Sequence, residues 1–159
     1  MEAARVATVL ISGLYAGGVV VYMVVLPPLF AQIPAEHGVR VKRRIDPLND
    51  KFWPPFLIAT MVLAVVLLVF DDAASGTATA LTAVGLVCLI AVPVITRGLV
   101  IPVNRQIHEL PADATDEAER RGMDEAFRSL HRRWGVLHAV RMAVALAAFA
   151  AFTIALALG

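Results

Sequence analysis

The chain has 159 residues, of which 59% are hydrophobic, and its mean hydropathy is +0.76. A soluble domain is closer to half apolar, and here the excess is gathered into long uncharged runs, which excludes an ordinary soluble globular fold. The net charge of +1 gives no electrostatic basis for nucleic-acid binding, and no nucleic-acid partner is expected. Cys88 is the single cysteine, so an internal disulfide and a cysteine-based metal site are excluded as well.

Four segments are long and apolar enough to cross a bilayer, which takes about 20 residues of helix. We place these segments at residues 6–30, 53–70, 78–103 and 134–158. The first contains no charge and is longer than the apolar part of a signal peptide, so we expect it to remain as a permanent helix. The expected fold is therefore all-α, a four-helix transmembrane bundle that forms one membrane domain over residues 1–159.

The three connections between these segments differ in charge. Residues 31–52 carry five Lys or Arg, residues 71–77 carry none, and residues 104–133 carry six. Because Lys and Arg are retained on the cytoplasmic side, we expect the first and third connections to be cytoplasmic and both termini to lie outside. The third connection is expected to contain an interfacial helix over 116–133, which starts in the acidic stretch 113–117 and runs into the fourth segment.

Two arginines, Arg97 and Arg141, lie inside the third and fourth apolar segments. An arginine in the bilayer costs at least about 2.5 kcal/mol, so these positions need an explanation. Each arginine lies about 10 Å along its helix from the cytoplasmic end, and antiparallel packing would bring both to one level. One interpretation is a shared polar site. The other is that both side chains extend to the lipid headgroups.

Helical spacing predicts that further polar side chains share these two faces. The face on the third segment holds Arg97, Asn104 and His108, provided that the helix continues through Pro102, and the face on the fourth holds His131, Trp134, His138 and Arg141. Tyr22 on the first segment is expected to approach the same place. If the two faces meet, they form a polar pocket just below the cytoplasmic headgroups.

Several of these residues also have a purely structural interpretation. His108 and His131 would then be ordinary surface histidines at the membrane edge, and His138 would join two helices by a hydrogen bond. Trp53 and Trp134 are expected at the membrane–water interface, where tryptophan commonly anchors helices.

Two short motifs resemble those of the anthrone oxygenase-like membrane proteins. They are Ile101-Pro-Val-Asn104-Arg-Gln-Ile107 and Trp134-Gly-Val-Leu-His138-Ala-Val-Arg141. The four-span layout with a long polar third connection is similar too, so the resemblance covers essentially the whole chain. It implies a membrane monooxygenase that oxidises an anthrone, which is an apolar tricyclic aromatic, to an anthraquinone.

The chemistry implied by this resemblance gives the site residues their roles. An anthrone has an acidic carbon between two aryl rings, and His138 would be the base that removes its proton. Arg97, Asn104 and Arg141 would hold the resulting enolate. The substrate-binding residues are expected to be Tyr22, Trp134, His108 and His131. Because an electron-rich enolate can react with dioxygen directly, no cofactor and no metal is predicted.

The sequence is also compatible with two functions other than the monooxygenase, which are a metal or haem protein and a non-catalytic subunit. His108, His131 and His138 could bind copper, iron or haem, with His37 as a remote ligand. The arginines would repel a bare cation but could pair with haem propionates, which favours haem among the metal alternatives. The third function is a non-catalytic membrane subunit that binds an anionic lipid or a quinol. Membrane lipid is an expected partner in each case, and Gly13 and Gly17 would permit a homo-oligomer.

Overall fold

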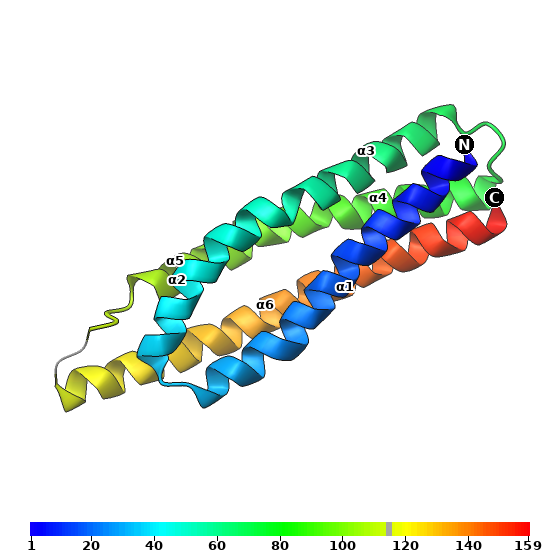
Figure 1. Cartoon of the computed structure of the whole chain (residues 1–159). Coiled ribbons are helices and arrows are strands. Elements are labelled where there is room, and N and C mark those ends of the chain that lie inside the picture. Colours follow the sequence, from blue (N-terminus) through cyan, green and yellow to red (C-terminus); the bar gives the residue numbers. More distant parts are fainter. Residues whose placement is uncertain (114–115) are drawn as a thin grey trace.

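Residues 1–113 and 116–159 are described in a computed structural model of the chain, and they form an elongated bundle of helices (Figure 1). The helices that run along its length are α1 (Glu2–Gln32), α3 (Pro54–Phe70), α4 (Gly76–Ile95) and α6 (Glu117–Leu158). At one end lie α2 (Ala35–Phe52) and α5 (Ile101–Glu109), and a π-helical turn, η1 (Thr96–Val100), joins α4 to α5. Four helical segments are apolar and long enough to cross a membrane. The described chain is thus an all-α integral membrane protein, as predicted.

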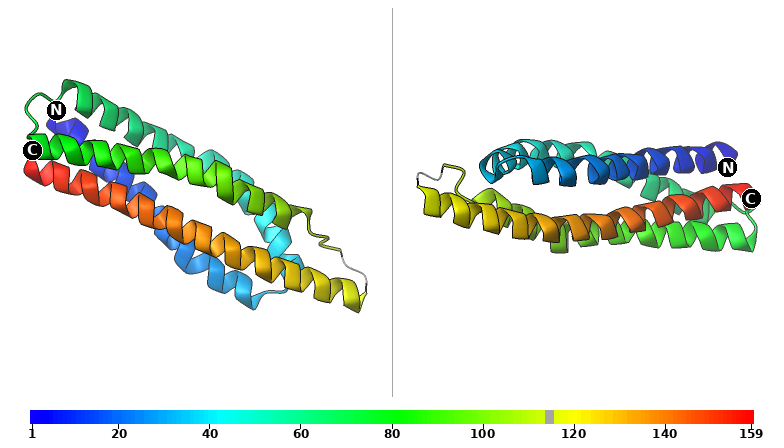
Figure 2. Two further views of the ribbon diagram at one scale, coloured as in Figure 1. Left: turned by 180° about the vertical axis from the view of Figure 1, so that it is seen from behind. Right: turned by 90° about the horizontal axis from the view of Figure 1, so that it is seen from below.

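The four long helices contact one another in the ring order α1, α3, α4, α6. Both termini and the turn between α3 and α4 lie at one end of the bundle, and α2, α5 and the start of α6 lie at the other (Figures 1 and 2). We call this second end the polar end, because it holds the two Lys- and Arg-rich stretches 31–52 and 104–133. That the polar end is cytoplasmic stays a prediction.

Most of the first charged connection is helical, which was not predicted from the sequence. α2 crosses the polar end of the bundle and leads into α3 (Figure 1). One face of α2 is buried, and Gly38 on that face lies directly against the ring of Phe127 from α6. A Cβ atom at Gly38 would overlap this ring, so glycine is what allows the two helices to approach closely here.

The helix predicted over 116–133 is present as the first part of α6, and it continues into the fourth span without a break. Ala114 and Thr115, which belong to the acidic stretch expected at its start, lie outside the described residues. Asp116 caps the helix by accepting a hydrogen bond from the backbone N–H of Glu119 at 2.8 Å. The 42 residues of α6 make about 63 Å of helix. This is about twice the hydrocarbon thickness of a bilayer, so the first part of α6 stands beyond it.

Two hydrophobic clusters hold the bundle together, one at the polar end and one within the spans. The polar-end cluster includes Phe30, Val39, Ile107, Phe127 and Trp134, and the other includes Tyr15, Val19, Leu89, Val92 and Phe152. Trp134 is 0% exposed, so the prediction that it anchors the fourth span at the membrane interface is wrong. The physical reason is that the side chains of Lys42 and His138 cover its ring.

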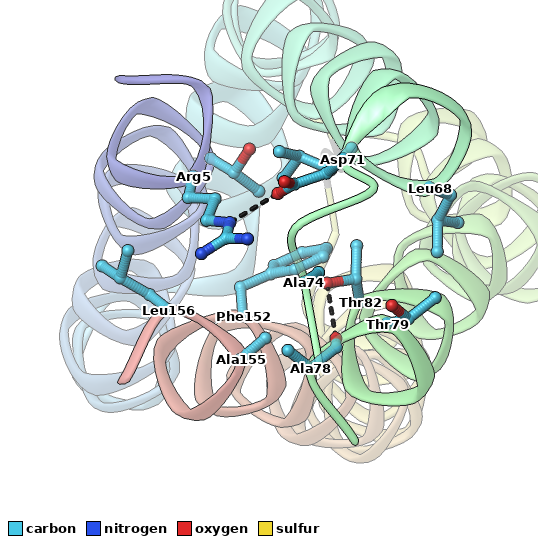
Figure 3. Close-up of a pocket in the computed structure, with 12 residues that line it drawn as sticks. Arg5, Leu68, Asp71, Ala74, Ala78, Thr79, Thr82, Phe152, Ala155 and Leu156 are labelled. Atoms are coloured by element: carbon cyan, nitrogen blue, oxygen red, sulfur yellow. Dashed lines mark hydrogen bonds and ion pairs between the residues drawn. The ribbon is translucent and has the colours of Figure 1, made fainter. Parts of the chain in front are cut away.

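An ion pair joins helices at the end of the bundle opposite the polar end. Arg5 of α1 pairs with Asp71, the residue that follows α3 (Figure 3). Both side chains are largely buried, with exposed fractions of 13% and 3%. At the same end, Ser75 caps α4 by accepting a hydrogen bond from the backbone N–H of Ala78. The ion pair ties the first helix to the turn between α3 and α4.

Candidate functional site

A cavity of about 530 Å³ lies among the helices near the polar end of the spans. Its volume is within the range of small-molecule sites, about 300–1,000 Å³. Much of its wall is apolar, and the side chains that form this part include Val19, Leu57, Met61, Val92 and Val100. All four long segments contribute to the lining, so the cavity depends on the assembled bundle rather than on any one helix.

The four residues predicted to be catalytic, Arg97, Asn104, His138 and Arg141, all line this cavity. The polar faces of the third and fourth spans therefore meet. Pro102 lies in the first turn of α5, where a missing N–H is tolerated, so the helical path continues through it. The π-helical turn that contains Arg97 lies just before it, and such turns are frequent at functional sites. Arg97 itself is exposed and lies on the rim of the cavity.

The imidazole of His138 is held by contacts on several sides, and its side chain is buried, with 3% exposed. Its Nδ1 lies 3.2 Å from the backbone carbonyl oxygen of Trp134. A carbonyl oxygen can only accept a hydrogen bond, so Nδ1 carries the proton and Nε2 of the neutral ring keeps its electron pair. The ring lies 3.9 Å from that of Trp134 and 5.7 Å from that of Tyr22, between centroids. These contacts fix the orientation of a proton acceptor at the cavity.

Two polar atoms at the cavity lack a hydrogen-bond partner among the described residues. They are Nε of Arg141 and Oδ1 of Asn104, and both are buried. Buried polar atoms of this kind are costly unless a ligand or a water molecule completes their hydrogen bonds. Together with the lone pair of His138, these two atoms provide hydrogen-bonding capacity at the cavity that a ligand could engage.

The residues that α2 contributes to the cavity were missed, because the stretch 31–52 was treated as a connection. Those that line the cavity are Asp46, Asn49 and Asp50, followed by Trp53 at the end of the helix. Asn49 donates a hydrogen bond to the hydroxyl oxygen of Tyr22 at 3.0 Å and accepts one from the indole N–H of Trp53 at 3.2 Å. The sequence signal that would have found them is their helical spacing, which places them on one face.

Asp46 is buried beside the cavity and holds two partners. Nζ of Lys42, one turn earlier in α2, lies 3.2 Å from Oδ2 of Asp46, and Nε2 of His108 lies 2.9 Å from the same oxygen. Lys42 is 0% exposed and its ammonium also lies 4.4 Å from the centre of the Trp134 ring. His108 does not line the cavity itself, but this hydrogen bond connects it to a residue that does.

The set predicted to bind substrate is divided by the structure. Tyr22 lines the cavity, whereas Trp134 and His131 do not. These two rings belong to a stack along α6, in which the His131 centroid lies 5.2 Å from Trp134 and 5.7 Å from Phe127. The stack lies behind His138, so its contribution to the site is to support that ring.

The histidines do not gather into a shared ligand set. Among the residues that the structure describes, no three His, Cys, Asp or Glu side chains converge in a way that could hold a metal ion. His37, considered as a remote ligand on the sequence, is exposed on α2 beside Glu36. Binding of haem or copper stays an alternative to the prediction of no cofactor, and spectroscopy can test it.

The fold and the cavity together define a class, that of small four-span membrane proteins with a largely apolar cavity near one end of the bundle. A family model described as anthrone oxygenase matches residues 48–151, a range that contains Arg97, Asn104, His138 and Arg141. The chain belongs to the anthrone oxygenase family. No curated protein and no solved structure was found to match it. Tyr22, Lys42 and Asp46 lie before the matched range.

Proposed function

We propose that this protein oxidises an apolar, anthrone-like aromatic with dioxygen and so forms the corresponding quinone. The observation that carries the proposal is that His138, Asn104 and Arg141 meet at one largely apolar cavity of about 530 Å³. Membership of the anthrone oxygenase family supports a membrane oxidoreductase of this kind. The apolar wall suits a tricyclic ring system, and the three polar groups suit the charge that develops during its oxidation.

The first step is proton abstraction. Nε2 of His138 removes a proton from the carbon between the two aryl rings, and the electron pair moves onto the carbonyl oxygen of the substrate. The resulting enolate is an anion, and the guanidinium of Arg141 and the Nδ2–H group of Asn104 donate hydrogen bonds to it. Donors that are already in place when charge develops lower the barrier most.

The second step is oxygen addition. The enolate gives its electrons to dioxygen, a carbon–oxygen bond forms, and a proton completes the hydroperoxide. Loss of the remaining C–H proton and cleavage of the O–O bond then give the ketone and hydroxide, which takes up a proton. One substrate and one dioxygen yield one quinone and one water, so atoms and electrons balance without another reductant.

Access from the membrane is part of the proposal. The exposed residues on the cavity rim include Pro54 and Ile58 of α3 and Ile101 of α5. This apolar part of the rim suits a substrate that arrives dissolved in the lipid. We place the polar end on the cytoplasmic side, because the Lys- and Arg-rich connections lie there and such connections are retained in the cytoplasm.

The test is oxygen uptake by the detergent-purified protein supplied with an anthrone, after subtraction of the uncatalysed oxidation. We expect one dioxygen consumed for each quinone formed, and no accumulation of hydrogen peroxide, because the second oxygen atom leaves as water. A rate equal to the uncatalysed one would contradict the proposal. A Soret band, or copper or iron in stoichiometric amount, would favour the metal alternatives. A copurified anionic lipid or quinol without turnover would favour the non-catalytic subunit.

A further inference from the structure

We propose that Asp46 and His108 form a proton path between the cavity and the water at the polar end. This inference rests on the proposed function, because it concerns the protons that the oxidation moves. Asp46 lies outside the range that the family model matches. The path adds a second proton-transfer site to the one at His138.

The two ends of the path lie in different environments. Asp46 of α2 lines the cavity and is 5% exposed, whereas the side chain of His108 on α5 is 31% exposed. A single hydrogen bond of 2.9 Å, from Nε2 to Oδ2, joins them. The path therefore consists of two side chains and leads from the buried carboxylate on the cavity wall to the surface of the bundle.

The position of His138 is the reason that a second proton path is useful. This side chain is 3% exposed, and it shares the cavity lining with Arg141, so the imidazolium that forms on proton abstraction is buried and lines the same cavity as another cation. In the step that breaks the O–O bond, His138 acts as the base and cannot at the same moment protonate the departing oxygen. Asp46 is a carboxylate on the wall of the same cavity and can serve both needs.

The hydrogen bond between His108 and Asp46 determines the order in which protons move along the path. A carboxylate only accepts, so Nε2 of His108 carries the proton when Asp46 is ionised. Inward transfer begins when water protonates Nδ1 of His108; the Nε2 proton then passes to Asp46 and from there to the departing oxygen. His108 is left with its proton on Nδ1, and from this state a proton that His138 has removed can pass outward through the same atoms. One transfer in each direction restores the pair, in agreement with an oxidation that consumes no net proton.

Neighbouring charges hold the pair in place. The ammonium of Lys42 lies 3.2 Å from Oδ2 of Asp46, and the guanidinium of Arg43 donates to the backbone carbonyl oxygen of His108 at 2.6 Å. Asp50 of α2 and Arg141 of α6 line the same cavity as Asp46 and complete its charged surroundings. Because Lys42 is fully buried, removing the Asp46 carboxylate would leave its charge without a partner. His108 is therefore the better residue for a test.

The experiment compares His108→Gln with the wild type in the anthrone assay. Glutamine can still donate a hydrogen bond to Asp46 but cannot pass a proton on, so we expect kcat to fall by about 10²-fold and KM to stay the same. In His108→Ala, added imidazole is expected to restore a large part of kcat. His37→Gln is the matched control, because that histidine lies on the surface of α2 with 57% of its side chain exposed and should retain full activity.

Besides the expected result, three others are possible, and each overturns the path. Unchanged kcat in His108→Gln overturns it and leaves the proposed function standing. A lower kcat with a raised KM and no recovery in imidazole would mean that His108 has a structural role, and this result also overturns the path. If the wild type itself gives no turnover, the proposed function fails first, and the proton path falls with it.

Discussion

Replacement of His138 by Gln is expected to lower kcat by about 10³-fold, because the side chain that we propose as the acceptor of the substrate proton is lost. The structure leaves Nε2 as the accepting nitrogen, since Nδ1 is committed to the carbonyl oxygen of Trp134. Proton abstraction comes before any reaction with dioxygen, so the whole sequence of steps slows. The measurement is the initial rate of quinone formation, corrected for uncatalysed oxidation.

A second substitution at the same position separates chemistry from packing. His138→Phe keeps an aromatic ring packed against both Tyr22 and Trp134 but has no nitrogen. We expect it to lose as much activity as His138→Gln while the thermal midpoint stays close to that of the wild type. If either variant folds and retains more than a tenth of the wild-type rate, another group must remove the proton.

The second large effect is expected for Arg141→Met, with a fall in kcat of about 10²-fold. Methionine keeps an unbranched apolar stem but has no donor for the enolate oxygen. Nε of Arg141 is buried and without an acceptor among the described residues, so the guanidinium has hydrogen-bonding capacity left for a ligand. KM for the neutral substrate should change less than kcat, because the anion exists only after proton abstraction. Steady-state kinetics over a range of anthrone concentrations give both values.

Two further variants sharpen the assignment of Arg141. Arg141→Lys keeps the charge but not the planar fork of donors, so an intermediate rate is expected. Arg97→Met removes a cation on the exposed rim, where the side chain can also extend to the lipid headgroups, and should cost less than Arg141→Met. Equal losses in Arg97→Met and Arg141→Met would contradict the leading role given to Arg141.

The meeting of Arg97, Asn104, His138 and Arg141 at one cavity follows from features that the sequence carries directly. Long apolar runs determine where the spans lie, and the spacing of residues along a helix determines which of them share a face. Charges exposed to the bilayer are costly, so two antiparallel helices with polar faces at equal depth are stabilised when those faces pack together. The first part of α6 was predictable in the same way, because apolar residues recur at helical spacing over 116–133.

The contribution of α2 could not be predicted in the same way. Its many charges resemble those of a solvated connection, and the burial of Lys42 and Asp46 depends on contacts with α5 and α6 that are distant in sequence. The same contacts explain the wrong prediction for Trp134, a tryptophan near the end of an apolar run that α2 covers. No local pattern specified the π-helical turn at Arg97, although prolines lie on both sides of it.

The central claim is that one cavity brings a base and a cation to the same aromatic ligand. The most direct measurement is an experimental structure of the protein with bound anthraquinone. We expect the ring system inside the cavity of about 530 Å³, with a carbonyl oxygen within hydrogen-bond distance of Arg141 and the ring edge beside His138. A ligand bound elsewhere, with Arg97 and Arg141 both turned outward to the lipid headgroups, would contradict this claim.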